Sequence, residues 1–305
     1  MPALCDLTGN GRGPVYTGPM FDALVETEVL AAHLDDPAWV VCDCRSVLTD
    51  PEAGPRFYAE SHIPGARYMH LERDLSGPLT PDTGRHPLPD PARLAAVLGR
   101  AGIGAETQVV AYDDAGGAYA ARLWWLLRWL GHTQVAVLNG GWQQWLKEAH
   151  PVTAEPPRVQ PREFAYREPD REAWLSTSEV LELVRGRKHG LLLDARGPAR
   201  FSGAEEPIDP VAGHVPGALN LPFATNLAPD GRFKCPAELR QRFEPLLHGC
   251  RADELVNMCG SGVTACHNLL AMEAAGIKGA RLYAGSWSEW IRDPARPVAR
   301  AVPPL

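Results

Sequence analysis

The sequence predicts an α/β protein of two similar domains, each a parallel sheet with helices on both faces. Apolar strand patterns alternate with helical patterns along the chain, as in parallel α/β sheets. Four landmarks of the first half recur in the same order in the second half. The length of 305 residues exceeds what a single core usually holds and suits two domains. Together these features indicate a duplicated domain.

The repeated landmarks are short and specific. Two apolar strands end in Asp-x-Arg, two segments have the sequence His-Ile/Val-Pro-Gly-Ala, two apolar strands precede a loop, and two segments read Gly-x-Trp-x-x-Trp. These pairs lie at 39–45 and 190–196, at 62–66 and 214–218, at 108–112 and 255–258, and at 140–145 and 285–290. Because order and spacing are kept, each half should fold into the same arrangement of strands and helices.

Helix and linker signals set the expected boundaries. Between Ala120 and Leu130 apolar residues recur at helical spacing before Gly131, which predicts an amphipathic helix with a glycine stop, with Arg122 and Arg128 on its solvated face. Residues 151–170 contain five prolines and predict a stiff connector. We therefore place the first domain at residues 22–150 and the second at 171–292, after a loose lead-in rich in Gly and Pro.

Composition excludes several classes of partner. A net charge of −7 leaves no basic surface for nucleic acid. No apolar run approaches the roughly 18 residues of a membrane span, and the N-terminus lacks a signal-peptide pattern, so we expect a cytoplasmic protein with no membrane partner. The seven cysteines show neither a disulfide framework nor paired zinc-ligand spacing, which predicts free thiols and no metal.

The most informative stretch is 255–267, where Cys259 ends an apolar strand and a glycine-rich loop leads into a helix. Backbone N–H groups of such a loop and the helix N-terminus carry partial positive charge, which stabilises a thiolate or another anion. Gly260 and Gly262 allow the backbone to curl around the sulfur. We predict that Cys259 is reactive and not a buried structural thiol. The first copy carries Asp113 at the same place, so we expect that domain to be catalytically silent and to form one wall of a cleft.

The loop 259–264, the two His-Ile/Val-Pro-Gly-Ala segments and the paired Gly-x-Trp-x-x-Trp endings resemble the tandem-domain rhodanese family, and the loop is similar to that of 3-mercaptopyruvate sulfurtransferases. The resemblance implies a cysteine that takes a sulfane sulfur from 3-mercaptopyruvate or thiosulfate and becomes a persulfide. That persulfide would pass the sulfur to a thiol, to cyanide or to a thioredoxin-type acceptor, without a cofactor. It also assigns Gly260, Gly262, Val263 and Thr264 to substrate binding.

Charge around the loop discriminates between substrates. Phosphatases with a similar loop place a phosphate-binding arginine six residues after the cysteine, where this chain has Ala265, so phosphate-ester hydrolysis is disfavoured. A loop without basic side chains favours mercaptopyruvate, and Arg200 matches the arginine that binds its carboxylate in the family. A second substrate arginine falls near residues 207–209, where this chain has none, and this leaves thiosulfate open as a donor.

Members of the mercaptopyruvate group also use a Ser–His–Asp relay for protons, and the resemblance places Ser261, His86 and Glu72 at its three positions. The relay suits the chemistry, because the leaving enolate must be protonated and histidine titrates near neutral pH. Asp194 and Arg196 are expected to form a structural ion pair, and Cys266 to be buried. The alternative function is that of a sulfur-carrier or redox-sensing binding protein that delivers its persulfide to a protein partner.

Overall fold

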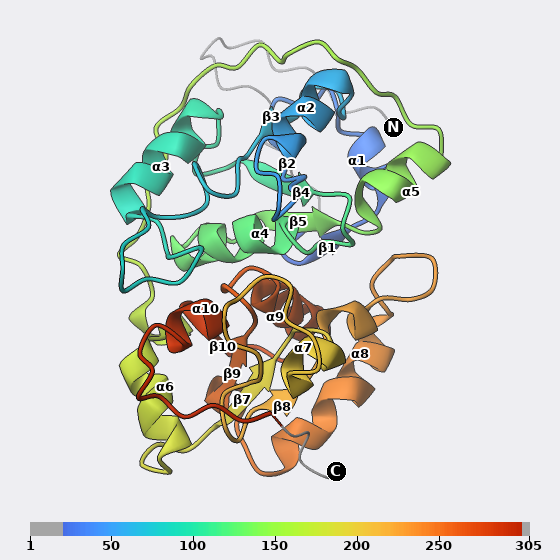
Figure 1. Cartoon of the computed structure of the whole chain (residues 1–305). Coiled ribbons are helices and arrows are strands. Elements are labelled where there is room, and N and C mark those ends of the chain that lie inside the picture. The colour runs from blue at the N-terminus through green and yellow to red at the C-terminus, as the bar shows by residue number, and fades with distance from the viewer. Residues whose placement is uncertain (1–20, 301–305) are drawn as a thin grey trace.

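The computed structural model describes residues 21–300. Figure 1 shows two α/β halves, one above the other, with the chain passing once between them. Residues 1–20, for which we expected a loose lead-in, lie outside the described range.

The first half contains a parallel five-stranded sheet in the order β1-β5-β4-β2-β3. Every strand pair in it is parallel, and the long central pair β2·β4 is in register from Trp39 opposite Gln108 to Asp43 opposite Tyr112. The strands are β1 (Leu24–Val25), β2 (Trp39–Asp43), β3 (Arg67–Tyr68), β4 (Gln108–Tyr112) and β5 (Val135–Leu138). The parallel sheet that the alternating pattern predicted is therefore confirmed.

Helices cover both faces of this sheet. Alternate residues of β4 point into different apolar clusters, with Val109 in one and Val110 in the other. Leu94 and Leu123, from α3 and α4, belong to the first cluster, and Leu30 and Trp145, from α1 and α5, belong to the second. The helices are α1 (Thr27–Ala31), α2 (Ala53–Glu60), α3 (Pro91–Arg100), α4 (Ala120–Trp129) and α5 (Gly141–Lys147).

The second half repeats this plan, with the sheet order β6-β10-β9-β7-β8 and all pairs again parallel. Its first long helix begins with a capping box, in which Ser176 and Glu179 each satisfy the other's backbone N–H. The strands are β6 (Trp174–Leu175), β7 (Leu191–Asp194), β8 (Leu219–Asn220), β9 (Leu255–Met258) and β10 (Arg281–Tyr283). The helices are α6 (Thr177–Val184), α7 (Pro198–Ser202), α8 (Pro236–Phe243), α9 (Ala265–Ala274) and α10 (Ser286–Trp290), with short 3₁₀ turns η1 (Arg171–Ala173), η2 (Phe223–Asn226), η3 (Glu244–His248) and η4 (Ala252–Glu254).

The connector runs without helix along the outside of the first half before it enters the second (Figure 1). It is tied down by backbone hydrogen bonds, from Arg162 N to Gly99 O at 2.9 Å and from Arg167 N to Leu130 O at 3.1 Å. Phe164 is buried in the first half's core. Prolines keep the segment extended, and these contacts fix its course.

The two halves share one apolar core. A single cluster of buried side chains includes Leu123 and Leu127 of α4 together with Leu269 and Met272 of α9, and Figure 1 shows these two helices facing each other between the halves. The expectation that α4 has a solvated face is wrong, because α9 covers it. Arg122 is fully buried, and Arg128 forms an ion pair across the halves with Glu273 at 2.8 Å.

Among the described residues, no helix has both the length and the apolar character needed to cross a bilayer. Within the same range, the cysteines are free thiols.

Candidate active site

Cys259 lies at the carboxyl end of β9, where parallel sheets bind ligands, and its loop leads directly into α9. Residues that follow the neighbouring strand β10 hold the backbone of Cys259. Cys259 N donates to Ser286 Oγ at 3.1 Å, and Trp287 N donates to Cys259 O at 3.0 Å. A cavity of about 300 Å³ opens beside it. Its walls come from both halves, including Tyr119 and Arg85 of the first.

The sulfur sits in a cradle of backbone N–H groups. Cys259 Sγ accepts from Gly262 N at 3.1 Å and from Ser261 N at 3.5 Å, and the residue is only 2% exposed. Gly262 has φ +79°, and a Cβ there would lie 2.4 Å from Ala284 O, so only glycine fits. This arrangement stabilises an anionic sulfur without any basic side chain in the loop.

Ser261, His86 and Glu72 form a chain across the two halves. Ser261 Oγ lies 2.7 Å from His86 Nδ1, and His86 Nε2 lies 3.6 Å from Glu72 Oε1. We assign the ring proton to Nε2, because a carboxylate faces that nitrogen, so Nδ1 accepts from the serine hydroxyl. The backbone of Glu72 is held by His70, because His70 Nδ1 accepts from Glu72 N at 3.2 Å and from Arg73 N at 3.3 Å. The structure thus brings together the three residues that the resemblance proposed for the relay.

The surroundings of His86 favour its neutral form. Burial lowers the pKa of the His86 ring, Glu72 partly restores it, and the nearby Arg122 and Arg85 charges lower it further. Burial opposes ionisation of Glu72, but its interaction with His86, a backbone hydrogen bond and the neighbouring His70 together outweigh this and lower the pKa of the carboxyl group. His86 is therefore a neutral imidazole at neutral pH, able to accept a proton from one side while a carboxylate orients it from the other.

The segment that carries His86 is docked on the second half. Gly84 N donates to Glu289 Oε2 at 3.3 Å, and Arg85 N donates to Ser288 Oγ at 3.0 Å. Figure 1 shows this loop, between β3 and α3, reaching down beside α10. These contacts fix His86 relative to Ser261 although the two residues belong to different halves.

Arg122 is a functional-site residue that sequence reasoning assigned wrongly to the solvated surface. Its side chain is completely buried, and Nη1 donates to Gly262 O at 3.2 Å while Nη2 donates to His86 O at 3.2 Å. It therefore joins the sulfur cradle to the histidine loop. Helical periodicity placed it opposite the apolar stripe, and no local signal in the sequence indicates that a second domain covers that face.

Arg200 lines the same cavity from α7. Its Nη2 lies 2.8 Å from Glu206 Oε1 and 3.0 Å from Asp209 Oδ2, and its side chain is 20% exposed. Val263 and Thr264 line the wall next to Cys259. The structure thus gathers the proposed donor-binding residues around one cavity, and the two carboxylates hold the guanidinium of Arg200 in a fixed orientation.

Arg85 is a second cation in this cavity, and sequence reasoning missed it. Its Nη1 pairs with Asp209 Oδ1, so Asp209 holds both Arg85 and Arg200. A Cβ at Gly260 would lie 2.8 Å from Arg85 Nη2. Residues 207–209 contain no arginine, and the second cation comes instead from the other half of the chain. The only sequence signal was its place next to His86.

The equivalent loop of the first half holds an anion of its own. The Asp113 carboxylate is buried and accepts four backbone N–H groups, from residues Ala115, Gly117, Tyr119 and Ala120, at 2.7–2.8 Å. Burial raises the pKa of Asp113, and the four backbone donors oppose that rise. The loop geometry therefore binds a negative group in both halves, but in the first half the chain's own side chain fills the cradle.

Two further clusters lie outside this chemistry. Cys266 is buried beneath the loop, and burial raises the pKa of its thiol to about 12, which makes it a poor nucleophile. Within residues 21–300, the potential metal ligands whose donor atoms lie within 4.8 Å of one another are His189, Cys250 and Glu254. They flank the amino ends of β7 and β9, at the opposite edge of the sheet from Cys259.

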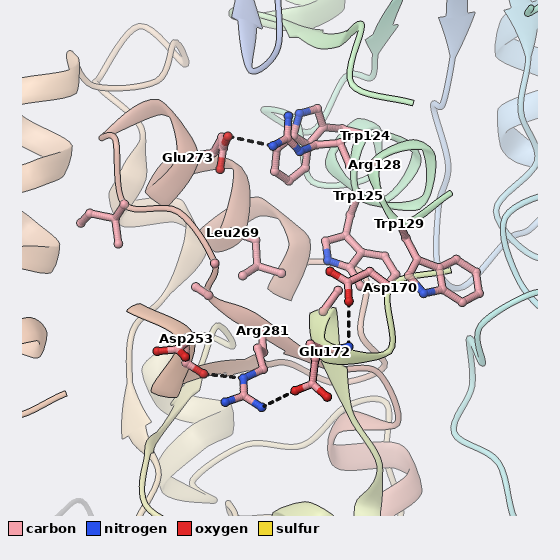
Figure 2. A pocket seen from close by; sticks show the side chains of 14 residues that line it. Trp124, Trp125, Arg128, Trp129, Asp170, Glu172, Asp253, Leu269, Glu273 and Arg281 are labelled. Carbon is pink, nitrogen blue, oxygen red and sulfur yellow. Dashed lines mark hydrogen bonds and ion pairs between the residues drawn. The ribbon is translucent and has the colours of Figure 1, made fainter. Parts of the chain in front are cut away.

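A larger cavity of about 430 Å³ lies between the halves at α4 and α9. Figure 2 shows Trp124, Trp125 and Trp129 on one side of it and Arg281 on the other. Its lining has no cysteine, serine, threonine or histidine, and Arg281 is paired with Glu172. We therefore assign the chemistry to the smaller cavity at Cys259.

Comparisons with known proteins agree with this fold. The rhodanese-like domain family matches residues 26–148 and 176–293. A protein of Pseudomonas aeruginosa named "Probable 3-mercaptopyruvate sulfurtransferase" is 51% identical over 278 residues, which cover 90% of this chain and 97% of that protein. The thiosulfate sulfurtransferase of Rattus norvegicus is 37% identical over 284 residues, covering 90% of this chain and 93% of the relative.

Solved structures show the same likeness. The 3-mercaptopyruvate sulfurtransferase from Leishmania major superimposes with a TM-score of 0.78 at 29% identity, covering 90% of this chain and 76% of that one. SseA from Escherichia coli, described as a 3-mercaptopyruvate sulfotransferase, gives a TM-score of 0.75 at 31% identity, covering 88% of this chain and all of SseA.

The duplicated parallel sheet and the cysteine cradle define a tandem-domain member of the rhodanese family, and the chain belongs to that family. Within it, the chain is a sulfurtransferase, akin to enzymes named for 3-mercaptopyruvate or thiosulfate.

Proposed function

We propose that the chain transfers sulfur from 3-mercaptopyruvate through a persulfide on Cys259, with thiosulfate as the alternative donor. The observation that carries this proposal is the proton relay beside the sulfur: Ser261 Oγ, 2.7 Å from His86 Nδ1, lies next to a thiol held by two backbone N–H groups. A donor whose leaving group must be protonated needs such a relay, and a donor that releases sulfite does not.

The first half-reaction follows from this geometry. The Cys259 thiolate attacks the donor sulfur, the S–S bond forms, and the C–S bond breaks with its electron pair passing to carbon as the enolate of pyruvate. The proton on the transferred sulfur then moves through Ser261 and His86 to the enolate carbon. Pyruvate is released, and Cys259 remains as the persulfide anion in the backbone cradle.

The second half-reaction returns the free thiolate. Cyanide attacks the outer sulfur and leaves as thiocyanate, or one thiol of a dithiol takes the sulfur and its neighbour releases it as H₂S while a disulfide forms. We propose a thioredoxin-type dithiol as the protein acceptor. A reducing compartment such as the cytoplasm suits this acceptor and the free thiols of residues 21–300.

The two halves have different roles in this proposal. Cys259, Ser261 and the loop residues Gly260, Gly262, Val263 and Thr264 act from the second half. The first half is catalytically silent, because Asp113 fills its cradle, and it supplies His86 and Glu72. Arg200 binds the donor carboxylate.

Two measurements test the proposal. After incubation with 3-mercaptopyruvate and no acceptor, the intact mass of the protein should rise by one sulfur, and that of Cys259→Ser should not. With cyanide as a common acceptor, kcat/KM should be higher for 3-mercaptopyruvate than for thiosulfate. A persulfide on Cys266 would refute the assigned nucleophile, and a preference for thiosulfate would refute the donor. Absence of turnover with either donor would favour the sulfur-carrier alternative.

A further inference from the structure

Two guanidinium groups, one from each half, face the same empty space above Gly260. The Cβ position of Gly260 lies 2.8 Å from Arg85 Nη2 and 3.5 Å from both terminal nitrogens of Arg200. Both side chains are partly exposed, at 25% and 20%, and both line the cavity beside Cys259. Because residue 260 is glycine, it places no side chain of its own between the two guanidinium groups.

The pairing of these arginines leaves donors free on the side of the cavity. Arg85 uses Nη1 for Asp209, and Arg200 uses Nε and Nη2 for Glu206 and Asp209. Arg85 Nη2 and Arg200 Nη1 donate to no acceptor among residues 21–300. Asp209, whose side chain is 4% exposed, therefore holds the two guanidinium groups at a fixed separation while each keeps an N–H₂ group toward the cavity.

From this geometry we infer that Arg85 is a specificity-determining residue, which with Arg200 forms a clamp for the donor's carboxylate across the domain interface. A carboxylate has two oxygens, and each can accept from one of the unused N–H₂ groups. Arg85 is fixed for this purpose by its backbone N–H on Ser288 and by its bond to Asp209. The inference rests on the proposed function, since it names the group that the same site recognises.

The clamp explains why the loop of residues 259–264 can lack basic side chains. An anionic donor needs positive charge near Cys259, and residues 259–264 carry no cation. The charge comes instead from the first half, through a side chain that occupies the space where a longer residue at position 260 would project. Selectivity for a carboxylate thus depends on the docking of the two halves.

Binding tests the clamp independently of turnover. In a Cys259→Ser background, titration calorimetry with 3-mercaptopyruvate should show about ten- to a hundred-fold weaker binding for Arg85→Ala and Arg200→Ala, as expected when a charge-assisted contact is lost. Arg56→Ala, at an exposed arginine of α2, is the matched control and should bind normally. Equal binding by Arg85→Ala and the control, or no binding by Cys259→Ser itself, would overturn the clamp.

A neutral donor separates carboxylate recognition from a structural effect. With 1-mercaptopropan-2-one, in which a methyl group replaces the carboxylate, Arg85→Ala should turn over like the parent enzyme, while kcat/KM for 3-mercaptopyruvate falls by about ten- to a hundred-fold. Gly260 does not have a positive φ, and the close contact of its Cβ position, at 2.8 Å, is with Arg85 itself. A side chain at position 260 therefore fits once Arg85 is alanine, and Arg85→Ala/Gly260→Lys should recover part of the loss.

Equal losses with both donors would mean that Arg85 only supports the interface, and would overturn its assigned role. If the parent enzyme binds 3-mercaptopyruvate through Arg85 without turning it over, the clamp stands and the proposed function fails. The two ideas are therefore tested separately.

Discussion

At the scale of single residues, His86 illustrates how burial determines the protonation state of a side chain. Its ring is buried between Ser261 and Glu72, and the neighbouring arginines add positive charge. Burial and these charges lower its pKa below the ordinary value of about 6.5, so the ring is neutral and can carry a proton at neutral pH. Its function should therefore be lost only as the pH falls below that ordinary value.

This gives a prediction for the pH profile. With 3-mercaptopyruvate, kcat/KM should rise with pH along an acid limb whose midpoint lies below about 6.5, because protonated His86 cannot accept the proton. His86→Gln should remove that limb and lower kcat/KM by about 10²–10⁴-fold, the usual contribution of a general acid–base. Since Glu72 raises the pKa of His86, Glu72→Gln should move the limb to lower pH.

Thiosulfate provides the control for this profile. Attack of the Cys259 thiolate on its outer sulfur releases sulfite, and no proton is needed. His86→Gln should therefore leave kcat/KM for thiosulfate almost unchanged. Equal losses with both donors would show that His86 supports the structure of the site and not proton transfer.

At the scale of elements, the same strand–loop–helix unit occurs twice with different contents. After β9 the loop surrounds a thiol, and after β4 it surrounds the Asp113 carboxylate, which accepts four backbone N–H groups. The loop after β4 needs no bound ligand, because the anion that it surrounds is the chain's own Asp113 side chain. Asp113 therefore contributes to stability, and we expect no role for it in turnover.

Asp113→Asn should lower Tm by several degrees while leaving kcat at 25 °C nearly unchanged. The amide N–H₂ group would replace one carboxylate oxygen, for example the one that accepts from Tyr119 N and Ala120 N, and each unsatisfied buried donor costs about 1–3 kcal/mol. Differential scanning calorimetry with Asp114→Asn as the matched neighbour would measure this. A large loss of kcat in protein of normal Tm would instead give the first half a catalytic part.

At the scale of the whole molecule, the interface between the halves is part of the core. One apolar cluster runs through α4 and α9, and the fully buried Arg122 links the Gly262 and His86 carbonyls across it. Arg128 and Glu273 add an ion pair between the same helices. The position of His86 relative to Ser261 thus depends on the packing of both halves.

We predict that the second half alone, residues 165–305, loses at least about 10²-fold in kcat/KM with 3-mercaptopyruvate, because it lacks His86 and Arg85 and exposes α9. The full chain should unfold in one cooperative calorimetric transition, since its halves share one core. Full activity of the fragment would contradict a site built by both halves.

The sequence by itself determined the family, the duplicated parallel fold and the sulfurtransferase class, because these depend on local signals. Strand and helix periods, the glycine-rich loop around Cys259 and the paired landmarks are each readable within a few residues. The expected ion pair of Asp194 and Arg196 is of this kind, and it is present at 2.7 Å.

Only the tertiary structure decided how the two halves meet, and that contact makes the site. Helical periodicity marked Arg122 as solvated, but α9 covers it and its guanidinium holds loops of both halves. Likewise, Arg85 lies more than 100 residues from Arg200 in the chain, yet Asp209 holds both. Local patterns record which face of an element is apolar, but not which distant element covers the other face.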